Sequence, residues 1–177
     1  MRAFVAIEVP VTPGESYRSG APEHLTLRFL GEIANERVGV IERVLAPVGT
    51  RVAPFDLTLE GVGAFPSADR PRVVWVGASA GAAELVGLAG RVREALAAEI
   101  PAPVEEAFVP HLTLFRVRSA FDRRRAEELL RGEVPAPPPR NVRVAEFVLK
   151  ESVLSTRGAT HRTVAAFPLA GPPSDRA

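Results

Sequence analysis

Hydrophobic and polar positions alternate over short stretches of the chain, a period that is typical of β-strands with one buried face. Two of these stretches flank the segment from Pro66 to Pro71, whose turn-forming residues favour a hairpin. The strands predicted by this pattern cover residues 2–9, 24–30, 55–65, 72–78, 111–118, 141–153 and 160–169.

Three other stretches carry apolar residues at helical spacing. Asn35 opens the first, and Asp122 is expected to cap the third. The second covers residues 82–99 and should end at the prolines 101 and 103. Between these elements, residues 10–22 are expected to form a loop and residues 135–139 a stiff linker.

The order strand, helix, strand, strand occurs twice, once from His24 and once from His111. An internal repeat of this kind predicts two similar lobes that face each other. We therefore expect one α+β domain over residues 1–170, bilobal, with two pseudo-symmetric antiparallel sheets, flanking helices and a central cleft. Residues 171–177 are expected to be a disordered tail.

Composition narrows the functional classes. The chain has no cysteine, which excludes disulfides and thiolate chemistry and suits an intracellular, cytoplasmic protein. It has no apolar run long enough to span a bilayer, so no membrane partner is expected. The net charge of +1 gives no global attraction for nucleic acid, but Lys150 is the only lysine among 22 basic residues. Arginine favours bidentate phosphate contacts, although biased codon usage explains such a composition as well.

Each repeat begins with the same tetrapeptide, His-Leu-Thr-Leu, at residues 24–27 and 111–114. Strand alternation places His24 and Thr26 on one face, and the two leucines anchor the other face in the core. The same holds for His111 and Thr113. Two facing lobes would then line one cleft with two imidazoles and two hydroxyls.

Such a set of side chains suits phosphoryl chemistry near neutral pH. One imidazole can accept a proton while the other donates one, and hydroxyls can hold the non-bridging oxygens of a phosphate. A cyclic phosphodiester needs both proton transfers, and neither requires a metal or a cofactor. Local sequence does not distinguish the acid from the base.

The paired motifs, together with the opening segment Met1 to Pro10 and the segments 108–117 and 147–152, resemble the 2H phosphoesterase superfamily. Within it they are similar to the RNA 2′,3′-cyclic phosphodiesterases, also called 2′-5′ RNA ligases or LigT-like proteins. The resemblance implies hydrolysis of RNA 2′,3′-cyclic phosphate ends to 2′-phosphates, with tRNA fragments as one candidate substrate. In some relatives the site also runs in reverse and joins RNA ends.

The resemblance also implies residue roles. His24 would protonate the 3′ leaving oxygen and His111 would activate water, while Thr26, Thr113 and Arg116 would contact the phosphate. Strict alternation instead turns Arg116 away from His111, unless a bulge follows Leu114. By the same alternation Arg28 faces the cleft, so it is a secondary candidate for substrate binding.

One departure from the family pattern is a short segment, residues 11–23, where relatives carry a helix. The trimmed lobe leaves open a smaller substrate, such as a cyclic nucleotide or cyclic ADP-ribose phosphate. A non-catalytic module that binds RNA ends is the alternative from another class, and a monomer is expected in each case.

Four further features are interpreted structurally. His161 lacks a threonine two places on and is expected at the surface or in a structural role. Trp75 is expected to pack in its hairpin, and Phe4 in a core strand, with base stacking as the minor interpretation of each. The arginines 123–125 are interpreted as a solvated helix face.

Overall fold

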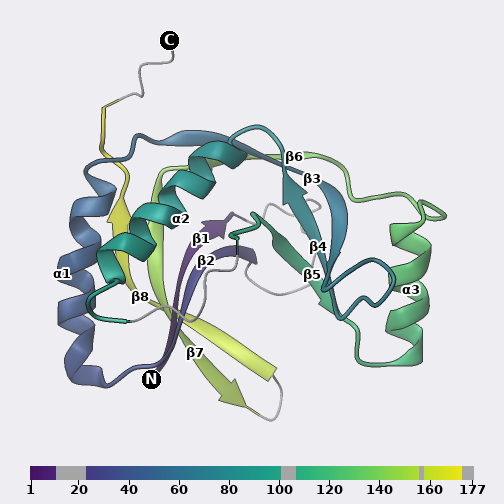
Figure 1. Ribbon diagram of the computed structural model, residues 1–177, viewed down its shortest axis with the longest axis horizontal. Helices are drawn as coiled ribbons and strands as arrows, with labels where there is room; N and C mark the ends of the chain where they lie inside the picture. The colour runs from purple at the N-terminus through teal and green to yellow at the C-terminus, as the bar shows by residue number, and fades with distance from the viewer. Residues whose placement is uncertain (11–22, 101–106, 156–157, 173–177) are drawn as a thin grey trace.

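The protein is built from two four-stranded antiparallel sheets with helices on their outer sides (Figure 1). The computed structural model describes residues 1–10, 23–100, 107–155 and 158–172, and the elements below are those of the described residues. In chain order they are β1 (Arg2–Val9), β2 (Glu23–Glu32), the 3-10 helix η1 (Asn35–Arg37), α1 (Val38–Gly49), β3 (Phe55–Phe65), β4 (Val73–Ala78), α2 (Ala82–Leu96), β5 (Leu112–Arg116), α3 (Ala120–Leu130), β6 (Arg140–Val144), β7 (Glu146–Ser155) and β8 (Gly158–Pro168).

The strand order is β2-β1-β7-β8 in the first sheet and β5-β4-β3-β6 in the second. This confirms the predicted α+β class with two antiparallel sheets. Each sheet takes strands from both halves of the chain, so the two sequence copies interleave and do not form one lobe each. The strands that carry the His-Leu-Thr-Leu motifs, β2 and β5, are both edge strands, and they approach each other across the junction of the sheets.

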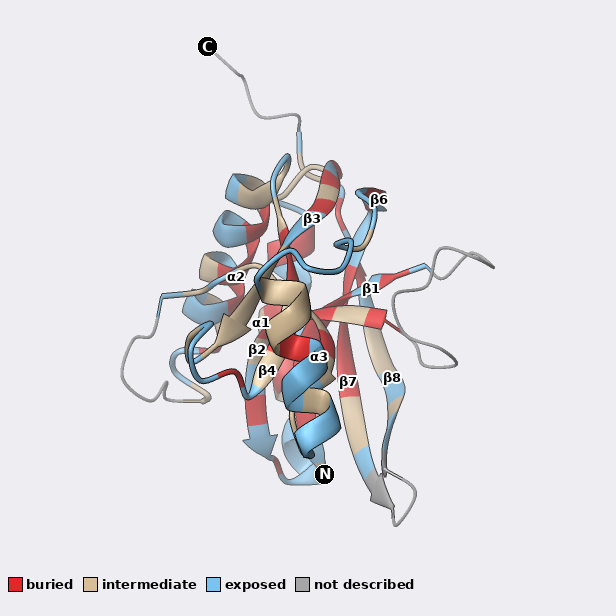
Figure 2. Cartoon of the chain, turned by 90° about the vertical axis from the view of Figure 1, so that its right-hand side faces the viewer, coloured by how far each residue is buried: buried red, intermediate tan, exposed pale blue. Residues whose placement is uncertain are grey.

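α1 and α3 lie on the outer sides of the sheets, whereas α2 lines one side of the groove between the motif strands. α1 packs on β7 and β8 and against α2, which in turn contacts β2, while α3 packs on β3. None of the helices among the described residues is long and apolar enough to cross a membrane. One continuous core joins both sheets, and Figure 2 shows β1 buried along most of its length. Fully buried members of that core include Val5, Leu25, Leu45, Leu57, Leu88 and Leu149.

Two helix starts have local causes. α2 begins after Gly81, whose φ of 78° is left-handed and whose missing Cβ would lie 2.2 Å from the carbonyl oxygen of Asp56, so only glycine fits. α3 is capped by Ser119, three residues before the expected Asp122. The Ser119 hydroxyl accepts from the Asp122 amide at 3.1 Å, and the Asp122 carboxylate accepts from the Ser119 amide at 3.0 Å.

The stretch 141–153, expected as one strand, divides at Ala145 into β6 and β7, which pair in different sheets. The alternation of local sequence does not reveal where a strand changes partner. α2 ends at Leu96, three residues before the expected end. Three predicted features lie outside the described residues: the expected loop at 11–22, the prolines 101 and 103, and residues 173–177 of the tail. The tail begins in an ordered contact, because the Gly171 amide donates to the Val52 carbonyl at 3.0 Å.

A buried ion pair connects the two sheets beside the first motif. An Arg140 guanidinium nitrogen on β6 lies 2.5 Å from a carboxylate oxygen of Glu23 on β2, and the two side chains are 8% and 0% exposed. Arg140 also donates to the carbonyl of Pro10. Because a buried charge is costly unless it is paired, this contact fixes the start of β2, one residue before His24.

Replacing Arg140 by methionine leaves the Glu23 carboxylate buried without its cationic partner. We expect Arg140→Met to lower the free energy of unfolding by about 3–5 kcal/mol, measured by denaturant unfolding at pH 7. Arg143→Met on the same strand is the matched control, because its partner Asp56 is 80% exposed. It should cost no more than about 1 kcal/mol. Equal losses for the two variants would show that the buried pair does not hold the sheets together.

Candidate active site

The first motif presents its histidine and threonine on the cleft face of the first sheet. In the β1–β2 ladder Glu8 pairs with His24 and Ala6 pairs with Thr26. Leu25 is fully buried and Leu27 is 6% exposed, which confirms that the leucines anchor the strand in the core. The second motif follows the same rule, since Leu112 and Leu114 are buried while His111 and Thr113 are half-buried.

Both motif strands carry a β-bulge at the fourth residue of the motif. In β2, Thr26 pairs with Ala6 and Arg28 with the next residue, Val5, so Leu27 is the extra residue. In β5, Thr113 pairs with Trp75 and Phe115 with the neighbouring Val74, so Leu114 is the extra residue there. A bulge reverses the alternation beyond it, and the residue two places after the bulge returns to the cleft face.

The bulge at Leu114 turns Arg116 towards the cleft, as a contact of Arg116 with the phosphate requires. Arg116 pairs with Val73, which lines the cleft, and directly paired residues share a face. Its charge also acts on His111, whose pKa it lowers. The ring of Phe115 lies on the other face, 4.4 Å below the guanidinium of Arg125. The arginines 123–125 are all exposed, as expected of a solvated helix face.

The bulge at Leu27 places Arg28 opposite the core residue Val5 in the ladder, yet its side chain still lines one end of the groove, where α2 borders it. Its guanidinium donates to the carbonyls of Arg93, at 3.0 Å, and Ile100 near the end of α2. A substrate contact by Arg28 stays a prediction, while its hydrogen bonds give it a structural role between β2 and the helix.

His24 lies in a cluster of three rings. Its centroid is 5.1 Å from Phe4 and 5.0 Å from His161, and the planes of the two imidazoles are 82° apart. Phe4 and His161 are themselves 5.1 Å apart. The surface or structural role expected of His161 stays a prediction, and the chain brings this residue from β8 against the catalytic candidate. Phe4 is buried, as expected, and its ring packs between those of His24, His161 and Phe29.

A carboxylate faces His24 from the neighbouring strand. Glu8 accepts hydrogen bonds from Lys150 on β7 and from the Thr163 hydroxyl on β8, the latter at 3.0 Å. The hydrogen bond from Lys150 lowers the pKa of Glu8 most. Burial opposes that shift, and the Thr163 hydroxyl and the charges of Lys150 and His24 add to it. Glu8 is thus held ionised opposite His24, and the charge of His24 is one of the causes of its lowered pKa.

The second histidine has the opposite environment. Nδ1 of His111 lies 2.8 Å from the carbonyl oxygen of Val109, and because a carbonyl only accepts, Nδ1 carries the proton. Phe65 packs edge-on against the ring at 4.8 Å, with Trp75 behind at 6.2 Å. Burial lowers the pKa of His111, the Val109 hydrogen bond partly opposes this, and the charge of Arg116 lowers it further. The neutral ring therefore exposes the lone pair of Nε2.

Trp75 packs in its hairpin, as expected, because β3 leaves room for it. A Cβ on Gly63 would lie 2.2 Å from the indole ring, so the absence of a side chain there admits the tryptophan. The indole in turn lies 5.3 Å from the ring of Phe65, and both rings support His111. A structural residue thereby fixes the orientation of the second histidine.

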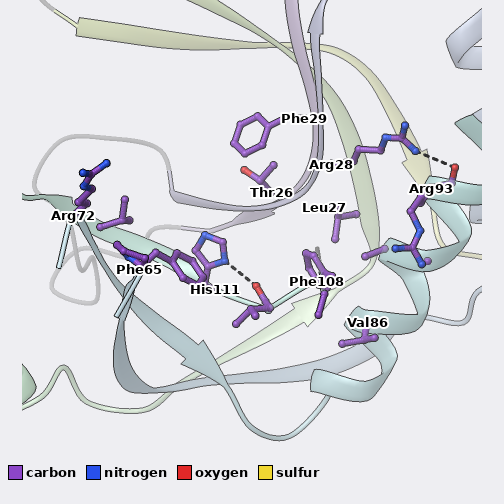
Figure 3. Close-up of a pocket in the computed structure, with 16 residues that line it drawn as sticks. Thr26, Leu27, Arg28, Phe29, Phe65, Arg72, Val86, Arg93, Phe108 and His111 are labelled. Atoms are coloured by element: carbon purple, nitrogen blue, oxygen red, sulfur yellow. Dashed lines mark hydrogen bonds between the residues drawn. The ribbon is translucent and has the colours of Figure 1, made fainter. Parts of the chain in front are cut away.

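The two motifs meet at one groove of about 1310 Å³. Thr26 and Phe29 project into it from β2, towards His111 and Phe65 on the opposite wall, whereas Arg28 turns towards α2 (Figure 3). Arg72 lies near one end and Arg93 near the other. His24 lies beyond this border, with Phe4 and His161. Among the described residues no group of three or more histidine, aspartate or glutamate side chains could hold a metal ion.

Comparisons with known proteins agree with this arrangement. A family model described as the 2′-5′ RNA ligase superfamily matches residues 11–153. The chain belongs to the 2′-5′ RNA ligase superfamily. A protein of Aeropyrum pernix named RNA 2′,3′-cyclic phosphodiesterase is 38% identical over 148 residues, which cover 80% of this chain and 78% of the relative.

Other superfamily members support the same placement. A protein of Archaeoglobus fulgidus with the same name is 34% identical, and the match covers 94% of this chain and 99% of the relative. The crystal structure of TT0787 of Thermus thermophilus has the same fold, with a TM-score of 0.70 and 25% identity, over 97% of this chain and 99% of that one. The resemblance seen in the paired motifs is thereby confirmed.

Sequence reasoning missed Phe29 as a residue of the groove, and it missed His161 and Glu8 as neighbours of His24. His161 and Glu8 reach His24 through strand pairing, which the sequence does not state. The sequence carried one signal, because Lys150 is the only lysine of an arginine-rich chain. The structure shows this lysine 3% exposed and bound to Glu8. Burial of a single lysine is a sign that its position is specific.

The environment of His111 predicts its tautomer and its titration. We expect long-range ¹H–¹⁵N correlation spectra at pH 7 to show the ring neutral, with the proton on Nδ1. Because burial lowers its pKa, the ring should become protonated only below the pH at which an ordinary histidine titrates. The chain has three histidines, so loss of a signal in His111→Asn assigns it. A proton on Nε2 at pH 7 would contradict this account.

Proposed function

We propose that this chain hydrolyses RNA 2′,3′-cyclic phosphate ends to 2′-phosphates, with His24 as the general acid and His111 as the general base. The observation that carries the proposal is the groove in which Thr26 of the first motif and His111 of the second line one space. The names of the Aeropyrum pernix and Archaeoglobus fulgidus relatives support the substrate class.

The division of roles follows from the surroundings of the two histidines. His111 presents a neutral Nε2, which takes a proton from water as the water attacks phosphorus. The bond from phosphorus to O3′ breaks, and His24, held beside ionised Glu8, gives its proton to that oxygen. Thr26 and Thr113 donate to the non-bridging oxygens, and Arg116 neutralises their charge. The product keeps the phosphate on O2′.

A 5′-hydroxyl can replace water in the same step, because the base removes a proton from either nucleophile. That reaction forms a 2′-5′ linkage and leaves a 3′-hydroxyl, in keeping with the description of the superfamily. Hydrolysis is the proposed direction where water is in excess.

The size of the groove favours an RNA end over a small cyclic nucleotide or cyclic ADP-ribose phosphate. Its volume of about 1310 Å³ exceeds the roughly 300–1,000 Å³ that is typical of small-molecule sites. A module that only binds RNA ends would need cations and donors, but it would not need two histidines in opposite electrostatic environments. Action on the cyclic phosphate ends of tRNA fragments, a monomeric state and a cytoplasmic location remain predictions.

Turnover should need both histidines. Phosphorus NMR of a cyclic-phosphate-ended oligonucleotide, incubated with the protein in excess EDTA, should show one 2′-monophosphate product. His24→Ala and His111→Ala should each lose at least roughly 100-fold in kcat and still bind the oligonucleotide. An unchanged cyclic phosphate with the wild-type protein would contradict the assignment of the substrate. Turnover in both variants would contradict the assignment of the site.

Removing the charge of Glu8 should alter the pH dependence of kcat more than the maximal value of kcat. Glu8→Gln keeps an acceptor for Lys150 but removes the negative charge opposite His24, whose ring also contacts His161 from β8. We expect the alkaline limb of the kcat profile to move to lower pH, because the protonated form of the general acid loses a stabilising negative charge.

The matched control for Glu8→Gln is Glu151→Gln. Glu151 follows Lys150 on β7 and therefore lies on the face of that strand that is turned away from Glu8. There Glu151 pairs with exposed Arg162 at 2.6 Å. Its profile should follow that of the wild-type protein. An unmoved alkaline limb in Glu8→Gln, or an equal shift in the control, would contradict the role assigned to Glu8.

A further inference from the structure

Large hydrophobic side chains are exposed at the groove. Phe29 is 68% exposed, and Val86 and Val109, which also line the groove, are 44% and 40% exposed. Exposed apolar groups that gather around a groove are typical of ligand sites rather than of an inert surface. The ring of Phe29 projects into the groove from the same face as Thr26 (Figure 3).

The bulge at Leu27 explains how Phe29 reaches this face. Beyond the bulge Phe29 pairs with Phe4, and their ring centroids are 6.1 Å apart with planes tilted by 44°. Phe4 contacts the ring of His24 in turn. Phe29 is thus supported from behind by the buried ring of Phe4, while most of its own surface is open.

Phe29 and Arg116 occupy equivalent positions in the two motif strands. Each follows the bulged leucine by two residues and faces the cleft. The two walls therefore differ in chemistry, because one presents a flat apolar ring and the other presents a guanidinium. A ligand that matches both must join a planar group to an anion, which is the chemistry of a nucleotide.

We propose that Phe29 is the stacking platform for the base of the nucleotide that carries the cyclic phosphate. This inference rests on the proposed function and adds to it a requirement for a base. Because every base has a π face, the platform accepts all four bases and discriminates against a ribose phosphate without one. Phe29 is therefore a specificity-determining residue of the site, and it takes no part in proton transfer.

The test compares ligands with and without a base, by equilibrium binding and by kinetics. Phe29→Ala should weaken binding of adenosine 2′-phosphate roughly tenfold and leave ribose 2-phosphate unaffected, since stacking is lost only where a base is present. With adenosine 2′,3′-cyclic phosphate the KM should rise by a similar factor while kcat changes little. Phe29→Trp should restore wild-type values.

Phe121 on α3 supplies the matched control, because it is 74% exposed and does not line the groove. Phe121→Ala should leave the affinity for both ligands unchanged. An equal loss of affinity for both ligands in Phe29→Ala would contradict the stacking role of Phe29. An equal effect in the Phe121→Ala control would contradict it as well. The wild-type protein could bind adenosine 2′-phosphate more tightly than Phe29→Ala does and yet hydrolyse no cyclic phosphate. That result would support the stacking role of Phe29 and contradict the proposed reaction.

Discussion

A buried charge must be neutralised where β2 begins, and that requirement ties the two sheets together one residue before His24. Glu23 is fully buried and Arg140 nearly so, and they belong to different sheets. Because either charge alone would be costly in the interior, the strands that carry them keep one relative position. The continuous core does the same over a larger area, since it contains residues of both sheets. The cleft therefore has two walls with a fixed separation, as proton transfer between two histidines and one phosphate demands.

Within this frame the repeated motif does more than supply two histidines. Its leucines anchor each edge strand, and its fourth residue is bulged in both copies, so each copy has three cleft positions: histidine, threonine and the residue two places beyond the bulge. The first two are the same in both copies, while the third is Phe29 in one and Arg116 in the other. The surroundings differ as well, with a carboxylate facing His24 and an apolar, hydrogen-bonded pocket around His111. Two similar motifs thereby become chemically unequal, as an acid and a base must be.

The parts that the sequence predicted are those with local causes. Alternation located the strands, and the two tetrapeptides located His24, Thr26, His111 and Thr113, because side-chain direction in a strand depends on nearest neighbours. The pairing of Arg28 with Val5 could not be predicted, because a bulge is a property of strand pairing. The division of β6 from β7 at Ala145 depends on which sheet each strand joins. His161 and His24 are more than a hundred positions apart in the sequence, and Glu8 is separated from His24 by a segment that lies outside the described residues. No periodicity encodes either proximity.

The central claim is that both motifs act on one phosphate. The most direct measurement is a crystal structure of the wild-type protein with adenosine 2′-phosphate. The account predicts one phosphate in hydrogen-bond contact with Thr26 and Thr113, with the imidazoles of His24 and His111 on opposite sides of it and Arg116 against its oxygens. A phosphate held by the residues of one motif alone, with the other histidine directed away from it, would contradict the account.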